Sequence, residues 1–157
     1  MKLTAQEEYG LRCLLQVARE EGDTVTLREV AAAEGLSVEY AGKLMRVLRL
    51  NGLVRSIRGA QGGYALARPA DEISAWDALS ALDGPLVDGG FCNTHKGRGA
   101  SCVRVDSGCS LRTLWTWIDG VLEQTLSRVT LVDLMQGGQS VAALLPQPDL
   151  HSAGVPR

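Results

Sequence analysis

The stretch from residue 26 to residue 67 narrows the possible folds more than any other part of this sequence. Its first half contains two short helical segments, one beginning after Thr26 and one after Ser37, because hydroxyl residues are good N-caps. Gly35 ends the first segment and lies in the turn between the two. Two short helices joined by such a turn are typical of the helix-turn-helix, whose second helix enters the major groove of DNA. A plain helical hairpin has the same periodicity, so this half alone leaves both open.

The second half of the stretch changes to the alternation of β-strands. Residues 53–58 and 64–67 alternate apolar and polar side chains, and the glycine-rich segment 59–63 joins them as the turn of a hairpin. A helix-turn-helix followed by a hairpin is a winged helix, so we predict a mainly α fold with a small β-wing. The glycines also allow the wing tip to approach a sugar–phosphate backbone, although a tight turn needs them as well.

The placement of charge favours DNA as the partner of this winged helix. The formal net charge is -2, but residues 40–70 contain six basic and no acidic residues, whereas residues 71–157 contain ten acidic and six basic ones. Such asymmetry places a phosphate-facing patch on an acidic protein, although a basic face without a partner is the simpler alternative. The predicted DNA contacts, from the start of the second helix and from the wing, are Ser37, Glu39, Tyr40, Lys43, Arg55, Arg58, Gly59, Gly62, Gly63 and Tyr64.

A glycine-rich loop carries three of the four cysteines. Cys92, Cys102 and Cys109 are separated by nine and six residues, among glycines, serines and basic residues that cannot build a core. Thiolates on such a loop are good ligands for an iron–sulfur cluster or a soft metal ion. His95, three residues after the first of them, leaves a Cys₃His zinc site open as the alternative. The fourth cysteine, Cys13, falls in a predicted first helix that begins after Thr4, and we expect it to be a small buried apolar side chain.

The longest helical pattern runs from residue 111 to about residue 129, after Ser110 as the predicted N-cap. Its apolar stripe is of the kind that usually packs in a core, yet little of the domain is left for it to pack on. Pairing with the same helix of a second subunit solves this problem, and the two-fold symmetry matches a palindromic DNA site. The predicted dimerisation residues are Leu111, Leu114, Trp115, Ile118, Leu122 and Leu126.

A chain of 157 residues fits one domain, or a small domain with an attached arm. We predict a winged helix-turn-helix domain over residues 1–83, a cysteine-bearing loop over 84–109, a dimerisation helix and a short helix over 110–136, and a disordered tail over 137–157. No run reaches the roughly 20 apolar residues of a membrane helix, and the N-terminus has no signal core, so we expect a cytoplasmic protein. Without a C-x-x-C pair or a nucleophile–base constellation, an enzyme is not expected.

Four parts of the sequence resemble a known family. The opening KLTAQEEYGLRCLLQVA, the segment LSVEYAGKLMRVLRLNGLVRSIRGAQGGYAL, the cysteine loop and the later TLVDL are similar to the iron–sulfur winged-helix transcription regulators of the IscR, NsrR and RirA type, over residues 2 to about 135. The resemblance implies a homodimer that binds a palindromic operator in double-stranded DNA. It also implies a 2Fe-2S or 4Fe-4S cluster that senses iron, redox state or nitric oxide.

The same resemblance suggests which residues hold the cluster. Cys92, Cys102 and Cys109 match the three cluster cysteines of the family in order, although this chain spaces them more widely. The histidine that some members use just after the third cysteine is missing here. Other members take a carboxylate from the first helix of the partner subunit, and Glu8 matches that position. The implied fourth ligand is therefore Glu8 across the dimer, with His95 as the alternative.

Overall fold

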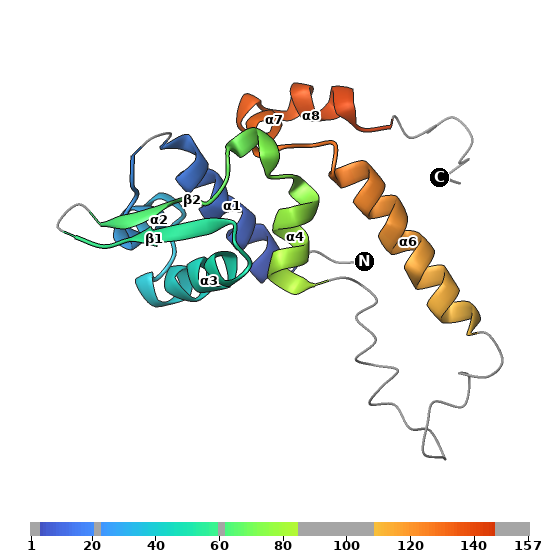
Figure 1. Ribbon diagram of the computed structural model, residues 1–157, viewed down its shortest axis with the longest axis horizontal. Coiled ribbons are helices and arrows are strands. Elements are labelled where there is room, and N and C mark those ends of the chain that lie inside the picture. The colour runs from blue at the N-terminus through green and yellow to red at the C-terminus, as the bar shows by residue number, and fades with distance from the viewer. Residues whose placement is uncertain (1–3, 21–22, 60–61, 85–108, 147–157) are drawn as a thin grey trace, which may run out of the picture.

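The computed structural model describes residues 4–20, 23–59, 62–84 and 109–146. The predicted winged helix is present (Figure 1), and it is formed by α1 (Ala5–Arg19), α2 (Leu27–Ala33), α3 (Val38–Leu50), β1 (Val54–Ile57) and β2 (Gly63–Leu66). It is followed by the 3-10 helix η1 (Ala70–Glu72) and by α4 (Ala75–Asp83), α6 (Ser110–Leu126), α7 (Leu131–Gln136) and α8 (Gly138–Leu144). No helix within the described ranges has the length and apolar character needed to cross a membrane.

Three helices begin after the hydroxyl residues that predicted them, because the side chains of Thr4, Thr26 and Ser37 each accept a hydrogen bond from the backbone N–H three residues on. Ser74 and Thr130 cap α4 and α7 in the same way. The prediction for Ser110 was off by one residue, because Cys109 occupies the N-cap of α6 and Ser110 is the first helical residue. That helix also ends at Leu126, three residues before the predicted end, because Ser127 is its C-cap.

The wing is slightly larger than the sequence indicated. β1 and β2 pair antiparallel, with Val54 opposite Leu66. Val25, in the connection between α1 and α2, adds an antiparallel bridge to Tyr64, through hydrogen bonds of 3.0 and 2.8 Å between their backbone groups. This backbone approaches β2 so closely that a Cβ on Gly63 would lie 2.5 Å from the Val25 carbonyl oxygen. Gly63 is therefore required by the packing of the sheet itself.

The core forms around α1, which contacts α2, α3, α4 and α7. Leu14 of α1 and Leu44 of α3 are completely buried. Gly10 faces Leu82 so closely that any side chain at position 10 would collide with it, and this contact brings α1 and α4 together. The remaining large side chains with less than 2% exposure include Met45, Leu48, Leu53, Ile73 and Leu131.

The chain returns to this core after α6. The Ala75 N–H donates to the Val129 carbonyl at 2.8 Å, and the Leu131 N–H donates to the Ile73 carbonyl at 2.9 Å. This short antiparallel contact anchors the segment after α6 to the start of α4. Helix α6 itself extends away from the winged helix, with its C-terminal end next to the body and its N-terminal end far from it (Figure 1).

The sequence predicted a disordered tail from residue 137, and the structure differs over its first part. Residues Gly138–Leu144 form α8, which packs beside α7. Gly137 adopts a φ of 105°, which ends α7 and redirects the chain into the next helix. The prediction missed α8 because glycines and small residues give little apolar periodicity. The rest of the predicted tail, from residue 147, lies outside the described residues.

Candidate nucleic-acid interface and cluster ligands

The start of α3 presents polar side chains to solvent. Ser37, Glu39 and Lys43 are all exposed, and the Ser37 hydroxyl accepts a hydrogen bond from the Tyr40 N–H at 3.1 Å. The opposite side of the helix is buried, with Leu44 at 0% exposure. Helix α3 is therefore fixed by its apolar side and leaves its polar side free for a groove of DNA, as the second helix of a helix-turn-helix requires.

Tyr40 differs from its predicted neighbours. Its ring is half-buried and meets the ring of Tyr9 edge to face, at 6.2 Å between centroids and 82° between planes. This contact holds the start of α3 against α1. Packing therefore accounts for the aromatic ring, and a DNA contact by Tyr40 stays a prediction.

The turn of the wing depends on its glycines. The Gly62 N–H donates to the Gly59 carbonyl at 3.0 Å, and a Cβ on Gly62 would lie 2.6 Å from the Ile57 carbonyl oxygen. Gly59 has a φ of 124°, which residues with a side chain rarely adopt. Arg58 is exposed beside this turn and forms no ion pair with the described residues. The glycines are thus explained by the geometry of the turn, and the phosphate contact of the exposed Arg58 stays a prediction.

Arg55 and Tyr64 lie on the two paired strands of the wing, Arg55 on β1 and Tyr64 on β2. The Nε of Arg55 donates to the Leu66 carbonyl at 3.2 Å, and the exposed guanidinium lines a cavity between the wing and α7. Tyr64 is half-buried and packs against the core. Both residues therefore make contacts within the protein, and their DNA contacts stay predictions.

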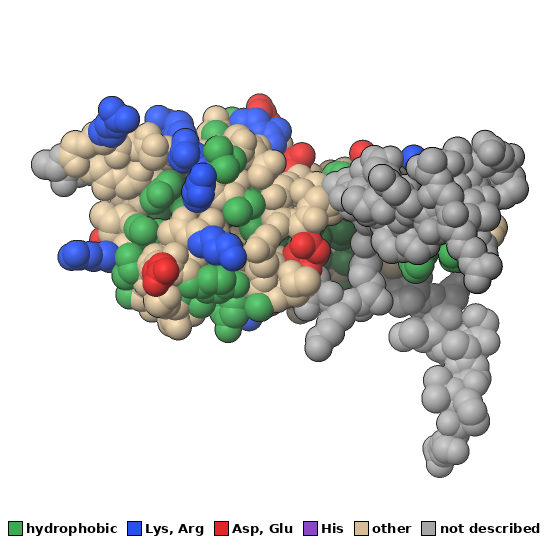
Figure 2. Space-filling view, turned by 90° about the horizontal axis from the view of Figure 1, so that it is seen from below, with side chains coloured by type: hydrophobic (Ala, Val, Ile, Leu, Met, Phe, Trp, Pro, Cys, Tyr) green, Lys and Arg blue, Asp and Glu red, His purple; other side chains and the backbone are tan. Residues whose placement is uncertain are grey.

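One further residue belongs with the predicted DNA-contacting set. Arg46, three residues after Lys43, is exposed on α3, and helical spacing puts both cations on neighbouring positions of one face. The sequence carried this signal, because positions three apart on a helix are adjacent. Figure 2, viewed from the side where α3 lies in Figure 1, shows several Lys and Arg side chains over the winged helix and few acidic ones.

Two of the predicted cluster ligands lie within the described residues. Cys109 is the N-cap of α6 and half-exposed, and its side chain makes no capping hydrogen bond. Glu8 is exposed on the first turn of α1 and accepts a hydrogen bond from the Nε of Arg12 at 2.8 Å. This contact, with the Glu8 charge, raises the pKa of Arg12. Arg12 also approaches the Glu34 carboxylate, at 3.9 Å, so it lies between Glu8 and the turn of the helix-turn-helix.

The remaining predicted ligands, Cys92, Cys102 and His95, lie outside the described residues. Within the described ranges, no three His, Cys, Asp or Glu side chains gather into a metal site. Cys13 is completely buried, and burial, with a smaller effect of Glu34, raises its pKa to about 11. Cys13 is therefore a protonated core thiol, as its place on the apolar side of the first helix predicted.

The apolar side of α6 is left largely exposed by the residues that the structure describes. None of the residues of α6 is buried, and Leu111, Leu114 and Trp115 are 51%, 47% and 48% exposed. Ile118 and two later residues of the predicted stripe, Leu122 and Leu126, are half-buried near the end that joins the body. A 17-residue helix with this much exposed apolar surface is a candidate interface.

Comparisons with known proteins find relatives that match most of this chain. A family profile described as Rrf2, iron-dependent transcriptional regulator, matches residues 3–137. The chain is 36% identical over 140 residues to protein rrf2 of Nitratidesulfovibrio vulgaris, covering 87% of this chain and 88% of that protein. It is 33% identical over 154 residues to the HTH-type transcriptional regulator IscR of Escherichia coli, covering 98% and 91%. The solved structure of CymR, the global cysteine regulator of Bacillus subtilis, matches with a TM-score of 0.65 at 32% identity, covering 87% of this chain and 97% of that one.

Proposed function

Since the chain belongs to the Rrf2 family of transcriptional regulators, we propose that it is a homodimer whose affinity for a palindromic operator is controlled by an iron–sulfur cluster. The observation that carries this proposal is that one element, α6, combines an uncovered apolar side with a cysteine at its start. Subunit contact and cluster ligation would then share a helix. A change at the cluster would act directly on the dimer.

The dimer is supported by the exposed apolar surface of α6. Burying side chains such as Leu114 and Trp115 against a second copy would remove apolar area from water, at roughly 25 cal/mol per Å². A two-fold dimer would also carry two copies of α3, one for each half of a palindromic operator. Lys43, Arg46 and Arg58 would supply the phosphate contacts that hold each half.

The distance between the start of α6 and α1 supports a cluster whose ligands come from two subunits. Figure 1 places the start of α6, with Cys109 as its N-cap, far from α1 of the same chain. A site that includes both Cys109 and Glu8 would therefore join two chains. The donors fit chemically, because Cys109 has a thiol free of capping hydrogen bonds and Glu8 has an exposed carboxylate whose described partner is Arg12, whereas Cys13 is buried and protonated.

The roles of the residues in control follow from this arrangement. A bound iron–sulfur cluster supplies a centre whose charge and ligation change on oxidation or nitrosylation. Cys92, Cys102 and Cys109 would hold it from one subunit, and Glu8 would close it from the other. A carboxylate is a weaker ligand than a thiolate, so Glu8 is the ligand most easily released, and its release would change the dimer geometry that sets half-site spacing.

The test measures iron, acid-labile sulfide and DNA affinity on the same anaerobically purified proteins. Cys92→Ala, Cys102→Ala and Cys109→Ala should each remove or badly destabilise the cluster, while Cys13→Ala is the matched cysteine control and should retain it. Glu8→Ala should keep some cluster, more easily lost, with weaker control of DNA affinity. A protein that binds no iron under these conditions would contradict the cluster, and its winged-helix assignment would remain testable by DNA binding alone.

The alternative function keeps the winged helix and replaces the cluster with a structural zinc ion held by Cys92, His95, Cys102 and Cys109. The wide spacing of the cysteines, compared with the family pattern, is the observation that favours it. Zinc is colourless, whereas an iron–sulfur cluster absorbs visible light. If His95→Ala lost the metal while Glu8→Ala kept it with unchanged DNA binding, the zinc site would replace the cross-subunit assignment.

A further inference from the structure

A cavity of about 510 Å³ opens at the base of the wing. Its walls come from the end of α1, the hairpin, the segment that leads into η1, and α7, and none of its lining residues belongs to α3 or α6. This volume falls in the range of sites that bind small molecules. The cavity is therefore separate from both the proposed DNA-reading helix and the proposed cluster ligand on α6.

The inner wall of the cavity is apolar and firmly held. Val17 and Ala18 of α1 are 2% and 1% exposed, and Ala70 at the start of η1 is 6% exposed. Val132 of α7 adds a further apolar side chain to the lining. Because these side chains belong to the core, the wall does not have to be ordered when a ligand binds, and this lowers the cost of binding.

The rim of the cavity carries more negative than positive charge. Glu20, Asp23 and Asp71 line it with three exposed carboxylates, and none of the three forms an ion pair with another described residue. Two arginines, Arg55 and Arg68, also line it. An excess of carboxylates disfavours a simple anion and favours a ligand that brings a positive charge.

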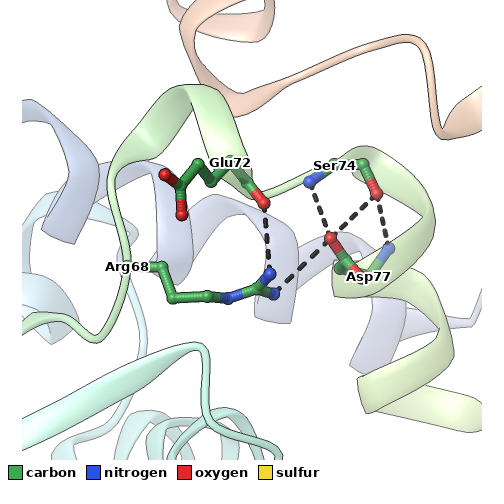
Figure 3. Close-up of polar contacts among 4 residues, drawn as sticks. All are labelled: Arg68, Glu72, Ser74 and Asp77. Atoms are coloured by element: carbon green, nitrogen blue, oxygen red, sulfur yellow. Dashed lines mark hydrogen bonds and ion pairs between the residues drawn. The ribbon is translucent and has the colours of Figure 1, made fainter.

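The two arginines are not equivalent. Figure 3 shows that Arg68 is already engaged, because it donates to the Glu72 carbonyl at 3.2 Å and pairs with the Asp77 carboxylate at 3.5 Å. That carboxylate in turn accepts hydrogen bonds from the N–H and hydroxyl of Ser74. Arg55 uses only its Nε, toward the Leu66 carbonyl, and its terminal nitrogens pair with no carboxylate in the described part of the chain. Arg55 is thus held in place with its outer donors available.

From these observations we propose that the cavity is an effector site for a small zwitterion, an amino acid or short peptide with an apolar side chain. Its carboxylate would pair with Arg55, its ammonium group with the carboxylates of the rim, and its side chain would cover the apolar wall. The hydrogen bonds to Arg55 and to the rim carboxylates would join ionised groups, and such bonds are roughly twice as strong as those between neutral groups.

The place of the cavity links a bound ligand to DNA. Its lining includes both strands of the wing and α7, and the bridge between Ser74 and Thr130 ties the start of α7 to the start of α4. A ligand that bridges these parts would bias the position of the wing, and DNA would change ligand affinity by the same factor as the ligand changes DNA affinity. This inference goes beyond the proposed function, because it requires neither the cluster nor the cysteine loop.

The test is calorimetric titration of the full chain with four probes: L-leucine, leucyl-leucine, N-acetyl-L-leucine and L-leucinamide. At least one of the two zwitterions, L-leucine or leucyl-leucine, should bind. Which of them binds shows how far apart the site requires the ammonium and carboxylate groups to be. Each blocked form lacks one charge, so it should bind at least about tenfold more weakly. Absence of binding by both zwitterions at millimolar concentration, or equal binding of N-acetyl-L-leucine, would overturn the proposal.

Variants locate the binding in the cavity. Arg55→Gln and Asp71→Asn should each weaken the zwitterion at least about tenfold, and Val132→Trp should block it by filling the space without changing charge. Ser56→Ala, on the same strand as Arg55 but outside the lining, is the control and should bind as the wild type does. Unchanged affinity in all three cavity variants would place the binding elsewhere and overturn the proposal.

The effector role has its own readout. The affinity of the wild type for a mixed-sequence DNA duplex, measured with and without saturating zwitterion, should differ, and the difference should vanish in Val132→Trp. Identical DNA affinity with and without the ligand would overturn the effector role. Because iron content is not involved, failure here is distinguishable from failure of the proposed cluster.

Discussion

The winged helix and helix α6 contain similar apolar side chains, but they bury them to very different extents. Leu14 and Leu44 in the winged helix are completely enclosed, whereas Leu111 and Leu114 of α6 are about half exposed at 51% and 47%. The difference lies in neighbours: α1 is surrounded by four other helices, while most of α6 stands away from the body (Figure 1). The comparison teaches that the winged helix has its own core, whereas α6, which touches α4, buries none of its residues against the described part of the chain.

The largest expected effect comes from placing a charge in the proposed subunit contact. Ile118→Asp should leave an unpaired charge between the two copies of α6 and weaken the dimer by about 3–5 kcal/mol. Sedimentation at micromolar concentration should then show a monomer. Thr116→Asp, an exposed position on the other side of α6, is the control and should remain dimeric. A dimeric Ile118→Asp protein would place the subunit contact outside α6.

The same leucine-to-alanine change should have different consequences in the two regions. Leu44→Ala opens a cavity in the winged-helix core and should lower the free energy of unfolding by about 2–5 kcal/mol. Leu114→Ala should cost much less in a monomer, and its effect should appear as weaker dimerisation. Urea unfolding at several protein concentrations separates the two, because only the second effect depends on concentration. If both variants lowered the free energy of unfolding equally at every protein concentration, the proposed difference between a buried core and a subunit contact would be wrong.

A charge change on the wing should affect DNA, and the same change beyond α6 should not. Arg58→Ala should weaken binding to specific and random DNA alike and reduce the slope of log affinity against log salt by about one unit. Arg128→Ala, an exposed arginine just after α6, is the control and should leave the slope unchanged. Fluorescence anisotropy over a range of salt concentrations measures this, and an unaltered slope in Arg58→Ala would remove the wing from the phosphate contacts.

The smallest expected effect concerns the cap of α7, where the chain returns from α6 to the core. The Thr130 hydroxyl, and then the Thr130 N–H, donate to the Asp133 carboxylate at 2.6 and 2.8 Å and lower its pKa. Because the folded pKa lies below the unfolded one, this stabilisation is present above the unfolded pKa and is lost as pH falls through the folded pKa.

Thr130→Ala should therefore lower Tm at neutral pH, by an amount equivalent to about 1 kcal/mol for the lost cap. The variant should also lose less further stability than the wild type when the pH is lowered. Thermal unfolding between neutral and acid pH measures both. Thr26→Ala offers the parallel case in the winged helix, because the Thr26 backbone and hydroxyl lower the pKa of Glu29 in the same kind of capping box. If Thr130→Ala lost stability with acid as steeply as the wild type, Asp133 would not be the group responsible.

Local chemistry explains why the winged helix was predictable. Thr4, Thr26 and Ser37 begin their helices through hydrogen bonds to residues three positions on, so the cause and its effect lie next to each other in the sequence. The hairpin was predictable for the same reason, since alternation and a glycine turn act over a few residues. The exposed polar side of α3, with Ser37, Glu39 and Lys43, follows directly from helical spacing.

Long-range contacts account for what the sequence did not reveal. The bridge between Val25 and Tyr64, and the need for Gly63 beside it, arise because the connection after α1 crosses the hairpin. Tyr40 was predicted as a DNA contact from its place at the start of α3, but its ring packs against the ring of Tyr9 on α1. Alternation placed Arg55 on the wing, and only the approach of α1, η1 and α7 gave it a cavity to line. Periodicity identifies the apolar side of a helix, but whether that side is covered depends on segments distant in sequence. Among the described residues such segments enclose α1 and leave the apolar side of α6 largely exposed.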